Sequence, residues 1–236
     1  MNAYFYPHEL VPTAVITHVL SYLGIGVTTD PNKAELKFHW DYKDVNLGHE
    51  GWINGECKNV EKWYVDQIFT KIFGYSSFID PSKSGICIKK DNKQCTKSSE
   101  LIVTPCKVEK GYIYQKYIDN VVNGWREVIR LVIAKKDMMI HTKIMKGLVR
   151  DGVEHCTDVK VDWDKILLSK EEKKKTILFC EKIGMEWGEL DALRDSDGKL
   201  YIIDVNNIPA IQSVDKIKDR DRFMKELSEM FKKNFL

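Results

Sequence analysis

Long apolar runs are missing from this 236-residue sequence, and no stretch approaches the roughly 20 residues that a membrane span needs. The amino terminus has no basic stretch followed by a continuous apolar segment, which is the pattern of a secretory signal. An excess of one charge is missing too, because 37 basic side chains face 35 acidic ones and leave a formal charge of +2. We therefore expect a cytoplasmic protein that binds neither membranes nor nucleic acids.

Several motifs of covalent and metal chemistry are also absent. The six cysteines contain no C-x-x-C pair, and neither they nor the six histidines have the spacing of a zinc site. No Gly-x-Ser-x-Gly segment marks a nucleophile, and no Gly-x-x-x-x-Gly-Lys-Ser/Thr loop marks a P-loop. We expect separate, reduced thiols, and any ATP site must be of another type.

The composition is that of a globular protein, with 43% hydrophobic residues, which is enough for one sizeable core or two small ones. Helical spacing predicts helices over 12–23, 60–73, 169–183 and 215–231. Short apolar runs between turn residues predict strands over 27–29, 35–40, 85–90, 101–103, 112–118, 127–134, 138–145, 188–193 and 200–205. Ser169 and Glu172 have the spacing of a capping box. Together these elements predict an α+β fold.

Three oxygen-bearing side chains are expected to meet on the last pair of strands. Asp204 and Asn206 lie two apart on one strand, so both point to the same face. A tight turn over 195–198 brings Asp191 of the preceding strand beside them. Two carboxylates and an amide oxygen form a hard site that suits Mg²⁺ with a bound phosphate. From the residues alone, the alternative is that Asp204 and Asn206 only cap a strand end.

The segment 188–209, GELDALRDSDGKLYIIDVNNIP, resembles the metal-binding hairpin of the ATP-grasp superfamily. Its members include carboxylate-amine ligases such as D-alanine:D-alanine ligase and enzymes with biotin carboxylase-like ATP-binding domains. The resemblance implies that Asp191, Asp204 and Asn206 bind one or two Mg²⁺ ions, or Mn²⁺, that bridge the phosphates of ATP.

The same resemblance implies the ATP-grasp fold, in which two lobes with antiparallel sheets grip the nucleotide between them. Residues 51–236 would form this domain, with a smaller lobe over about 51–110 and a larger lobe over about 111–236. The first 50 residues would form a reduced α/β segment in front of it.

Two further segments resemble the nucleotide-binding parts of the family. The strand 85–90, GICIKK, resembles the strand that ends in a phosphate-binding lysine. Because Lys89 and Lys90 face opposite sides of a strand, only one of them points at the nucleotide, and we favour Lys90 slightly. The segment 112–120, YIYQKYIDN, resembles the hinge that holds adenine and implies the contacts Gln115, Lys116, Tyr117 and Ile118. Taken alone, it is an amphipathic strand.

Basic residues elsewhere match positions where relatives neutralise phosphate charge. Lys62 corresponds to a lysine at the start of a helix, and the resemblance implies that it binds a phosphate of the nucleotide. Arg130 and Lys143 lie on the two strands after the hinge and are implied to act in catalysis. The alternative for Arg130 and Lys143 is an ordinary pairing of charges between strands.

The activity that the resemblance implies is that of an ADP-forming ligase. ATP phosphorylates a carboxylate, an amine attacks the acyl phosphate, and the acceptor is a small molecule or a peptide. Asp204 stands where most such ligases have Glu, and inositol-phosphate kinases of this fold also use Asp-x-Asn. A kinase acting on a hydroxyl of a sugar, an inositol or another small molecule is therefore the alternative, and a nucleotide-binding protein without turnover is the third hypothesis. A homodimer is a family-level expectation.

Overall fold

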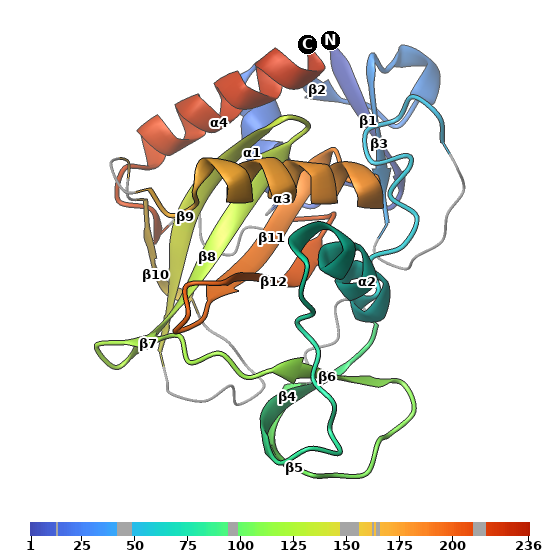
Figure 1. The fold of residues 1–236 in the computed structure, drawn as a ribbon. Helices are drawn as coiled ribbons and strands as arrows, with labels where there is room; N and C mark the ends of the chain where they lie inside the picture. The colour runs from blue at the N-terminus through green and yellow to red at the C-terminus, as the bar shows by residue number, and fades with distance from the viewer. Residues whose placement is uncertain are drawn as a thin grey trace.

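The structure is a computed structural model that describes residues 1–12, 14–41, 49–93, 99–146, 156–161, 163, 166–209 and 216–236. In this part of the chain, helices pack on three β-sheets (Figure 1). The α+β class expected from the sequence is confirmed. None of the described helices is both long enough and apolar enough to cross a membrane.

The first sheet is parallel and contains the start of the chain. Its order is β2–β1–β3, with β1 at Asn2–Pro7, β2 at Gly26–Val27 and β3 at Leu36–Trp40. Helix α1, Val15–Tyr22, makes the crossover between β1 and β2, which parallel neighbours require. A single turn of 3₁₀ helix at Pro31–Lys33 precedes β3.

The second sheet is antiparallel and has the order β5–β4–β6. Its strands are β4 at Gly85–Asp91, β5 at Ser99–Thr104 and β6 at Tyr112–Lys116. Helix α2, Lys62–Phe73, precedes this sheet and ends at Gly74. Gly74 has a φ of +87°, the left-handed conformation that glycine supplies at helix ends.

The third and largest sheet has the order β10–β9–β8–β11–β12, with β7 beside β8. Every pairing between the described residues of these strands is antiparallel. Its strands are β7 at Val121–Val122, β8 at Trp125–Ala134, β9 at Asp137–Lys146, β10 at Cys156–Lys160, β11 at Trp187–Arg194 and β12 at Leu200–Asn206. The hairpin turn expected between β8 and β9 is present, with Lys135 at a φ of +48°.

The alternation of side chains along β8 assigns the two faces of the largest sheet to different cores. Val132 and Ala134 pack with α1, the first sheet and α4, Arg220–Phe235. Ile133 packs on the other face, with α2 and α3, Lys170–Ile183. Figure 1 shows α3 lying across β8 and β11. The first sheet thus shares a core with the largest one, while the division at residue 50 and the lobe boundary at 110 stay predictions.

Strands β1, β7 and β10 were not expected from the sequence, and helix α4 begins later than predicted. For β1 the reason is that a strand at the start of a chain has no preceding turn residues to mark it. For α4 the reason is that Ile217 is buried in a parallel bridge with Val159 of β10 before the helix starts.

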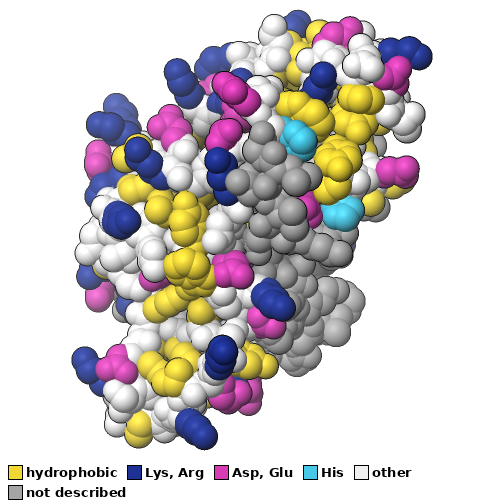
Figure 2. Space-filling model, turned by 90° about the vertical axis from the view of Figure 1, so that its right-hand side faces the viewer, with side chains coloured by type: hydrophobic (Ala, Val, Ile, Leu, Met, Phe, Trp, Pro, Cys, Tyr) yellow, Lys and Arg dark blue, Asp and Glu magenta, His cyan; other side chains and the backbone are white. Residues whose placement is uncertain are grey.

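Charges of both signs are distributed over the surface. Figure 2 shows Lys and Arg side chains interspersed with Asp and Glu over the described part of one face, with apolar side chains between them. The near balance of the whole chain, at +2, is therefore also a local balance on this face, and no field of one sign covers it.

Candidate functional site

A row of four polar side chains crosses the largest sheet from β9 to β12. The register places Arg130 of β8 between His141 of β9 and Asp191 of β11. Asp191 in turn lies opposite Asp204 of β12. Directly opposed residues of antiparallel strands project to the same face. One face of the sheet therefore carries an imidazole, a guanidinium and two carboxylates side by side.

A second pair extends this row by one step along the hairpin. Glu189 lies opposite Asn206, and the period of two puts both on the same face as Asp191 and Asp204. Neighbouring Gly188 leaves no room for a side chain, since a Cβ there would lie 2.8 Å from the carbonyl oxygen of Asn206. The three predicted metal ligands thus lie together, as the predicted strand pair requires.

Arg130 holds two carboxylates of this face at once. Its Nε donates to Oδ1 of Asp191 at 2.8 Å and its Nη2 donates to Oδ2 at 3.1 Å. Its Nη1 donates to Oε2 of Glu189 at 2.9 Å. The side chains of Arg130 and Glu189 are 11% and 2% exposed. The planar fork of a guanidinium suits this three-point contact, so Arg130 is fixed in the floor of the site.

Burial sets the protonation of this cluster. Burial alone would lower the pKa of Arg130, but the carboxylates of Asp191 and Glu189 outweigh it and keep that pKa above its usual value. Burial raises the pKa of Glu189, and the charge of Arg130 opposes the rise. Burial, with the charge of Arg130, lowers the pKa of His141 to about 3. His141 is therefore a neutral imidazole at pH 7.

The second sheet presents its own polar pair to the hairpin. Nζ of Lys90 donates to Oε1 of Gln115 at 2.6 Å and to the carbonyl of Ile203 at 3.4 Å. Nε2 of Gln115 contacts the same carbonyl at 3.5 Å. A bulge makes the carbonyl of Ile203 available for this contact, because the register of β11 and β12 shifts between Asp191 and Ala192.

A cavity lies where these two sheets meet. Its volume is about 810 Å³, including the part that is open to solvent. It brings together seven of the predicted residues, which are Lys90, Gln115, Lys116, Tyr117, Ile118, Lys143 and Asp191. A smaller cavity of about 240 Å³ is lined by Lys62, Gln115 and Asp204. Gln115 therefore links the predicted hinge to both cavities.

Other predicted residues point elsewhere. Nζ of Lys89 is bound to Glu109 and lies 4.4 Å from the ring centre of Tyr112, so the choice between Lys89 and Lys90 favours Lys90 as the lysine that faces the cavity. Nζ of Lys116 donates to Oδ2 of Asp195 at 2.6 Å, and its N–H donates to the carbonyl of Ser77 at 2.7 Å. Lys62 donates from Nζ to the carbonyl of Lys93 at 2.5 Å.

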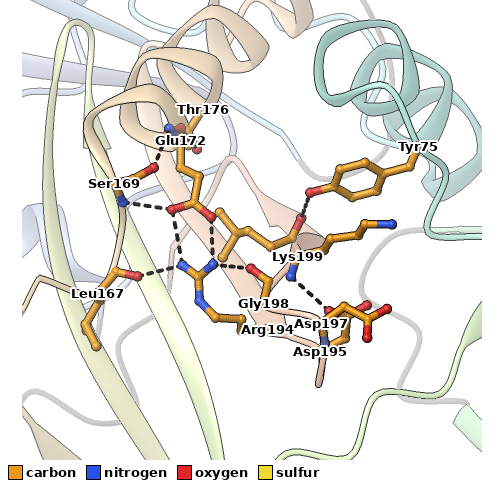
Figure 3. Close-up of polar contacts among 11 residues, drawn as sticks. Tyr75, Leu167, Ser169, Glu172, Thr176, Arg194, Asp195, Asp197, Gly198 and Lys199 are labelled. Atoms are coloured by element: carbon orange, nitrogen blue, oxygen red, sulfur yellow. Dashed lines mark hydrogen bonds and ion pairs between the residues drawn. The ribbon is translucent and has the colours of Figure 1, made fainter.

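The turn of the hairpin is anchored on α3 (Figure 3). Ser169 and Glu172 form the capping box that the sequence predicted, with Oγ of Ser169 accepting from the N–H of Glu172 at 3.2 Å. Arg194 donates to Oε1 of Glu172 at 2.7 Å and also to the carbonyls of Leu167 and Gly198. These contacts fix the turn, and through it the strands that carry Asp191 and Asp204.

Sequence reasoning missed three residues of this region. Glu189 and His141 complete the polar face, and Arg126, only 7% exposed, lines the larger cavity. A signal was available for Glu189, because it lies two residues before Asp191 on a strand and so shares its face. For His141 no such signal existed, since its place opposite Arg130 depends on the register of β8 and β9.

The donor set suits a hard divalent cation. Asp191 and Asp204 oppose each other in register, and Oδ1 of Asn206 accepts from the N–H of Ile208 at 3.2 Å, which leaves a lone pair on that oxygen. Oε1 of Glu189 is buried without a hydrogen-bond partner among the described residues. Within the described ranges, no three His, Cys, Asp or Glu side chains meet as a ready metal cluster. The predicted set instead combines two carboxylates with an amide, which magnesium with phosphate oxygens accepts.

Comparison with solved structures finds this arrangement of sheets and helices in ATP-grasp ligases. The D-cycloserine synthetase DcsG matches with a TM-score of 0.56 and 13% identity, over 98% of this chain and 99% of that chain. The ATP-grasp ligase PsnB, complexed with a minimal precursor, matches with 0.57 and 11%, over 87% and 90%. The macrocyclase MdnC from Microcystis aeruginosa MRC, bound with the precursor peptide MdnA, matches with 0.54 and 9%, over 98% and 99%.

No protein-family model and no curated protein matches the sequence. The likeness to the solved structures lies in the fold, and it extends over nearly the whole length of both chains. This chain therefore has the ATP-grasp fold, as the resemblance of the segment 188–209 predicted.

Proposed function

We propose that this protein is an Mg-ATP-dependent ligase that joins a carboxylate to an amine through an acyl phosphate and releases ADP. The observation that carries the proposal is the cavity between the second and the largest sheet, which Lys90 and Gln115 line from one side and Asp191 and Lys143 from the other. The ATP-grasp fold and the ligases that share it support the same conclusion.

The hinge residues hold the nucleotide base in this proposal. The main chain of 117–118, just after β6, offers N–H and C=O groups to the adenine edge, and Ile118, 5% exposed, gives the ring an apolar contact. Lys90, held by Gln115, places its ammonium where the phosphates follow. Lys62 lines the smaller cavity beside Asp204, and its ammonium would have to exchange the carbonyl of Lys93 for a phosphate oxygen to add a second positive charge.

Asp191, Asp204 and Asn206 hold one or two magnesium ions in this proposal, and Mn²⁺ can replace them. A metal held by these residues would neutralise negative charge on the phosphate groups. The donor set fits this role because its two carboxylates oppose each other in register. Asn206 adds a neutral oxygen to the two charged ligands.

Arg130 and Lys143 stabilise charge during the reaction in this proposal. A carboxylate oxygen of the acceptor attacks the γ-phosphorus, the bond from that phosphorus to the bridging oxygen breaks, and ADP leaves. The amine then attacks the acyl carbon, inorganic phosphate leaves with its bonding electrons, and the nitrogen loses a proton to form the amide. Lys143 lines the cavity and Arg130 is bound to Asp191, which also lines it, so both stabilise the negative charge on the transferred group.

A peptide is the acceptor that we favour, because PsnB and MdnC are complexed with precursor peptides. A small molecule is the other class, as the name of the D-cycloserine synthetase indicates. The second candidate activity is a kinase that acts on a hydroxyl compound, and the observation that favours it is Asp204, which is shorter than the Glu of most ligases of this fold.

Thermal stability with ATP, magnesium, both or neither tests the nucleotide site. A ligand that binds only the folded state stabilises it by about 2.7 kcal/mol at 100 times its dissociation constant. We expect Mg-ATP to raise the melting temperature of the wild type and Asp204→Ala to lose the magnesium-dependent part. Asp197→Ala is the matched control, since this exposed carboxylate lies in the turn of the same hairpin.

Product analysis then separates the activities. ADP release that needs both a carboxylate and an amine supports the ligase, whereas phosphate on a hydroxyl compound supports the kinase. Stabilisation by Mg-ATP without any turnover supports a nucleotide-binding protein. If millimolar Mg-ATP gives no stabilisation that depends on Asp204, the metal site itself is contradicted.

A further inference from the structure

Arg130 and the expected metal compete for one carboxylate. Two nitrogens of Arg130 take both oxygens of Asp191, at 2.8 and 3.1 Å. The side chain of Asp191 is 22% exposed, so a cation can approach it from the cavity. A divalent cation bound to Asp191 must therefore share or displace the guanidinium, because two positive charges at one carboxylate repel each other.

Glu189 is a second hydrogen-bond acceptor for Arg130. The third donating nitrogen of Arg130 is bound to Oε2 of Glu189 at 2.9 Å. Oε1 of Glu189 is buried and has no hydrogen-bond partner in the described part of the chain. A carboxylate with an unused oxygen can accept a further N–H without giving up the first. A small rotation of the guanidinium away from Asp191 thus has an acceptor ready on the same face.

The position of Glu189 suits this task. It lies two residues before Asp191 on β11 and directly opposite Asn206 on β12. Its side chain is 2% exposed, so solvent does not compensate its charge, and Arg130 is its ionic partner. Separating these two charges in the interior costs several kcal/mol. Glu189 is therefore a buried ionic partner that Arg130 keeps when its two contacts with the more exposed Asp191 are lost.

We propose that Glu189 is a positioning residue that retains Arg130 beside the reaction centre when a divalent cation takes Asp191. Arg130 then acts as an internal counter-ion of Asp191 in the metal-free protein and is released toward Glu189 on metal binding. The inference rests on the proposed function, in that Asp191 is taken as a metal ligand. It adds a role for Glu189, and it predicts that Arg130 contacts both Asp191 and Glu189 without metal and Glu189 alone with metal.

The proposal is tested by titrating Mn²⁺ into the nucleotide-free protein. The electron paramagnetic resonance signal of the free ion measures how much Mn²⁺ is bound. Arg130→Lys keeps a positive charge but cannot span two carboxylates, so Asp191 loses its two-point contact with Arg130 and Mn²⁺ binds more tightly. Glu189→Gln leaves Arg130 with Asp191 as its charged partner, so Mn²⁺ binds more weakly. We expect changes of about fivefold or more in these opposite directions, the lower end of ordinary coupling between two sites.

Two comparisons separate this role from simpler ones. In the Arg130→Lys background, adding Glu189→Gln is expected to weaken Mn²⁺ binding by less than half the factor seen in the wild-type background. An equal factor in both backgrounds makes Glu189 a direct metal ligand and overturns the positioning role. Glu226→Gln breaks the Arg222–Glu226 pair of α4 and is expected to leave Mn²⁺ affinity within about twofold of the wild type.

The failure of this inference is distinct from failure of the proposed function. If Mg-ATP stabilises the protein through Asp204 while the wild type, Arg130→Lys and Glu189→Gln bind Mn²⁺ equally, only the positioning role is overturned. If Asp204→Ala leaves the Mg-ATP stabilisation unchanged, the metal assignment fails and this inference fails with it. Circular dichroism of both variants checks that the fold is intact, and Glu189→Asp replaces Glu189→Gln if that variant does not fold.

Discussion

The side-chain amide of Asn54 is bound to both main-chain polar groups of Trp187. Its Oδ1 accepts from the N–H of Trp187 at 2.9 Å, and its Nδ2 donates to the carbonyl of Trp187 at 2.7 Å. The same amide accepts from the N–H of Glu186 at 2.8 Å and donates to the carbonyl of Asn207 at 3.1 Å. A fully buried side chain thus ties the segment before α2 to both ends of the hairpin that carries the candidate metal ligands.

Replacing Asn54 by Ala is expected to lower the free energy of unfolding by about 3 kcal/mol, because buried main-chain groups lose their partners. Urea unfolding measures this change. Asn54 also has a φ of +62°, and Asn123, exposed in the turn between β7 and β8, has a φ of +52°. Asn123→Ala therefore controls for the backbone cost alone, about 1 kcal/mol. Equal losses in the two variants would show that the hydrogen bonds of Asn54 contribute nothing.

The two adjacent lysines of β4 are expected to differ in nucleotide binding. Lys90→Met removes the ammonium that faces the cavity beside Gln115 and should weaken the binding of a non-hydrolysable ATP analogue about tenfold or more, which corresponds to one charge-assisted hydrogen bond. Lys89→Met is the matched control, since Lys89 is paired with Glu109, and its affinity should stay within about twofold. Isothermal titration calorimetry measures both. A larger loss in Lys89→Met would reverse the assignment.

Much of the fold could be predicted because its elements carry local signals. The capping box of Ser169 and Glu172 and the glycine after α3 mark that helix at both ends. The turn 195–198 and the alternation on each side of it predict the β11–β12 hairpin, and so the meeting of Asp191 with Asp204. These are short-range relationships, which spacing alone expresses.

The rest of the site depends on the register between strands that are distant in sequence. Arg130 meets Asp191 only because β11 pairs with β8, and His141 joins them only because β9 pairs with β8 at that register. The spacing of residues within one segment does not predict which residues of two distant strands pair. The sequence suggested that Arg130 acts on transferred phosphate, and it contained no sign that Arg130 also holds Glu189.

Breaking the contact of Arg194 with Glu172 is expected to destabilise the protein moderately. The contact joins the turn of the hairpin to the start of α3, and the side chains are 32% and 20% exposed. Partial exposure reduces its strength, so Arg194→Leu should lower the free energy of unfolding by about 1–2 kcal/mol in urea. Glu226→Ala removes a more exposed pair within α4, with Arg222, and should cost under about 0.5 kcal/mol. Similar losses would mean that the anchor on α3 has no special role.

Acid sensitivity is expected to depend on His141. Burial lowers its pKa to about 3 in the folded protein, whereas a histidine in an unfolded chain has a pKa of about 6.5. Between these values the unfolded chain binds a proton that the folded protein does not, so stability falls as the pH falls. The charged groups facing this imidazole are Arg130, Lys143 and Asp191, and the ring of Phe223 packs against it at 5.5 Å.

Urea unfolding of the wild type and His141→Gln from pH 7 to pH 4.5 isolates this contribution, because the other titrating groups are present in both proteins. Below about pH 6 the wild type should lose about 1.4 kcal/mol per pH unit relative to the variant. His141→Asn, which also cannot titrate, should give the same slope as His141→Gln although it packs differently against Phe223. Parallel stability curves for the wild type and both variants would show that the imidazole takes up its proton equally in the folded and unfolded states, and the polar face would then be open enough to hydrate His141.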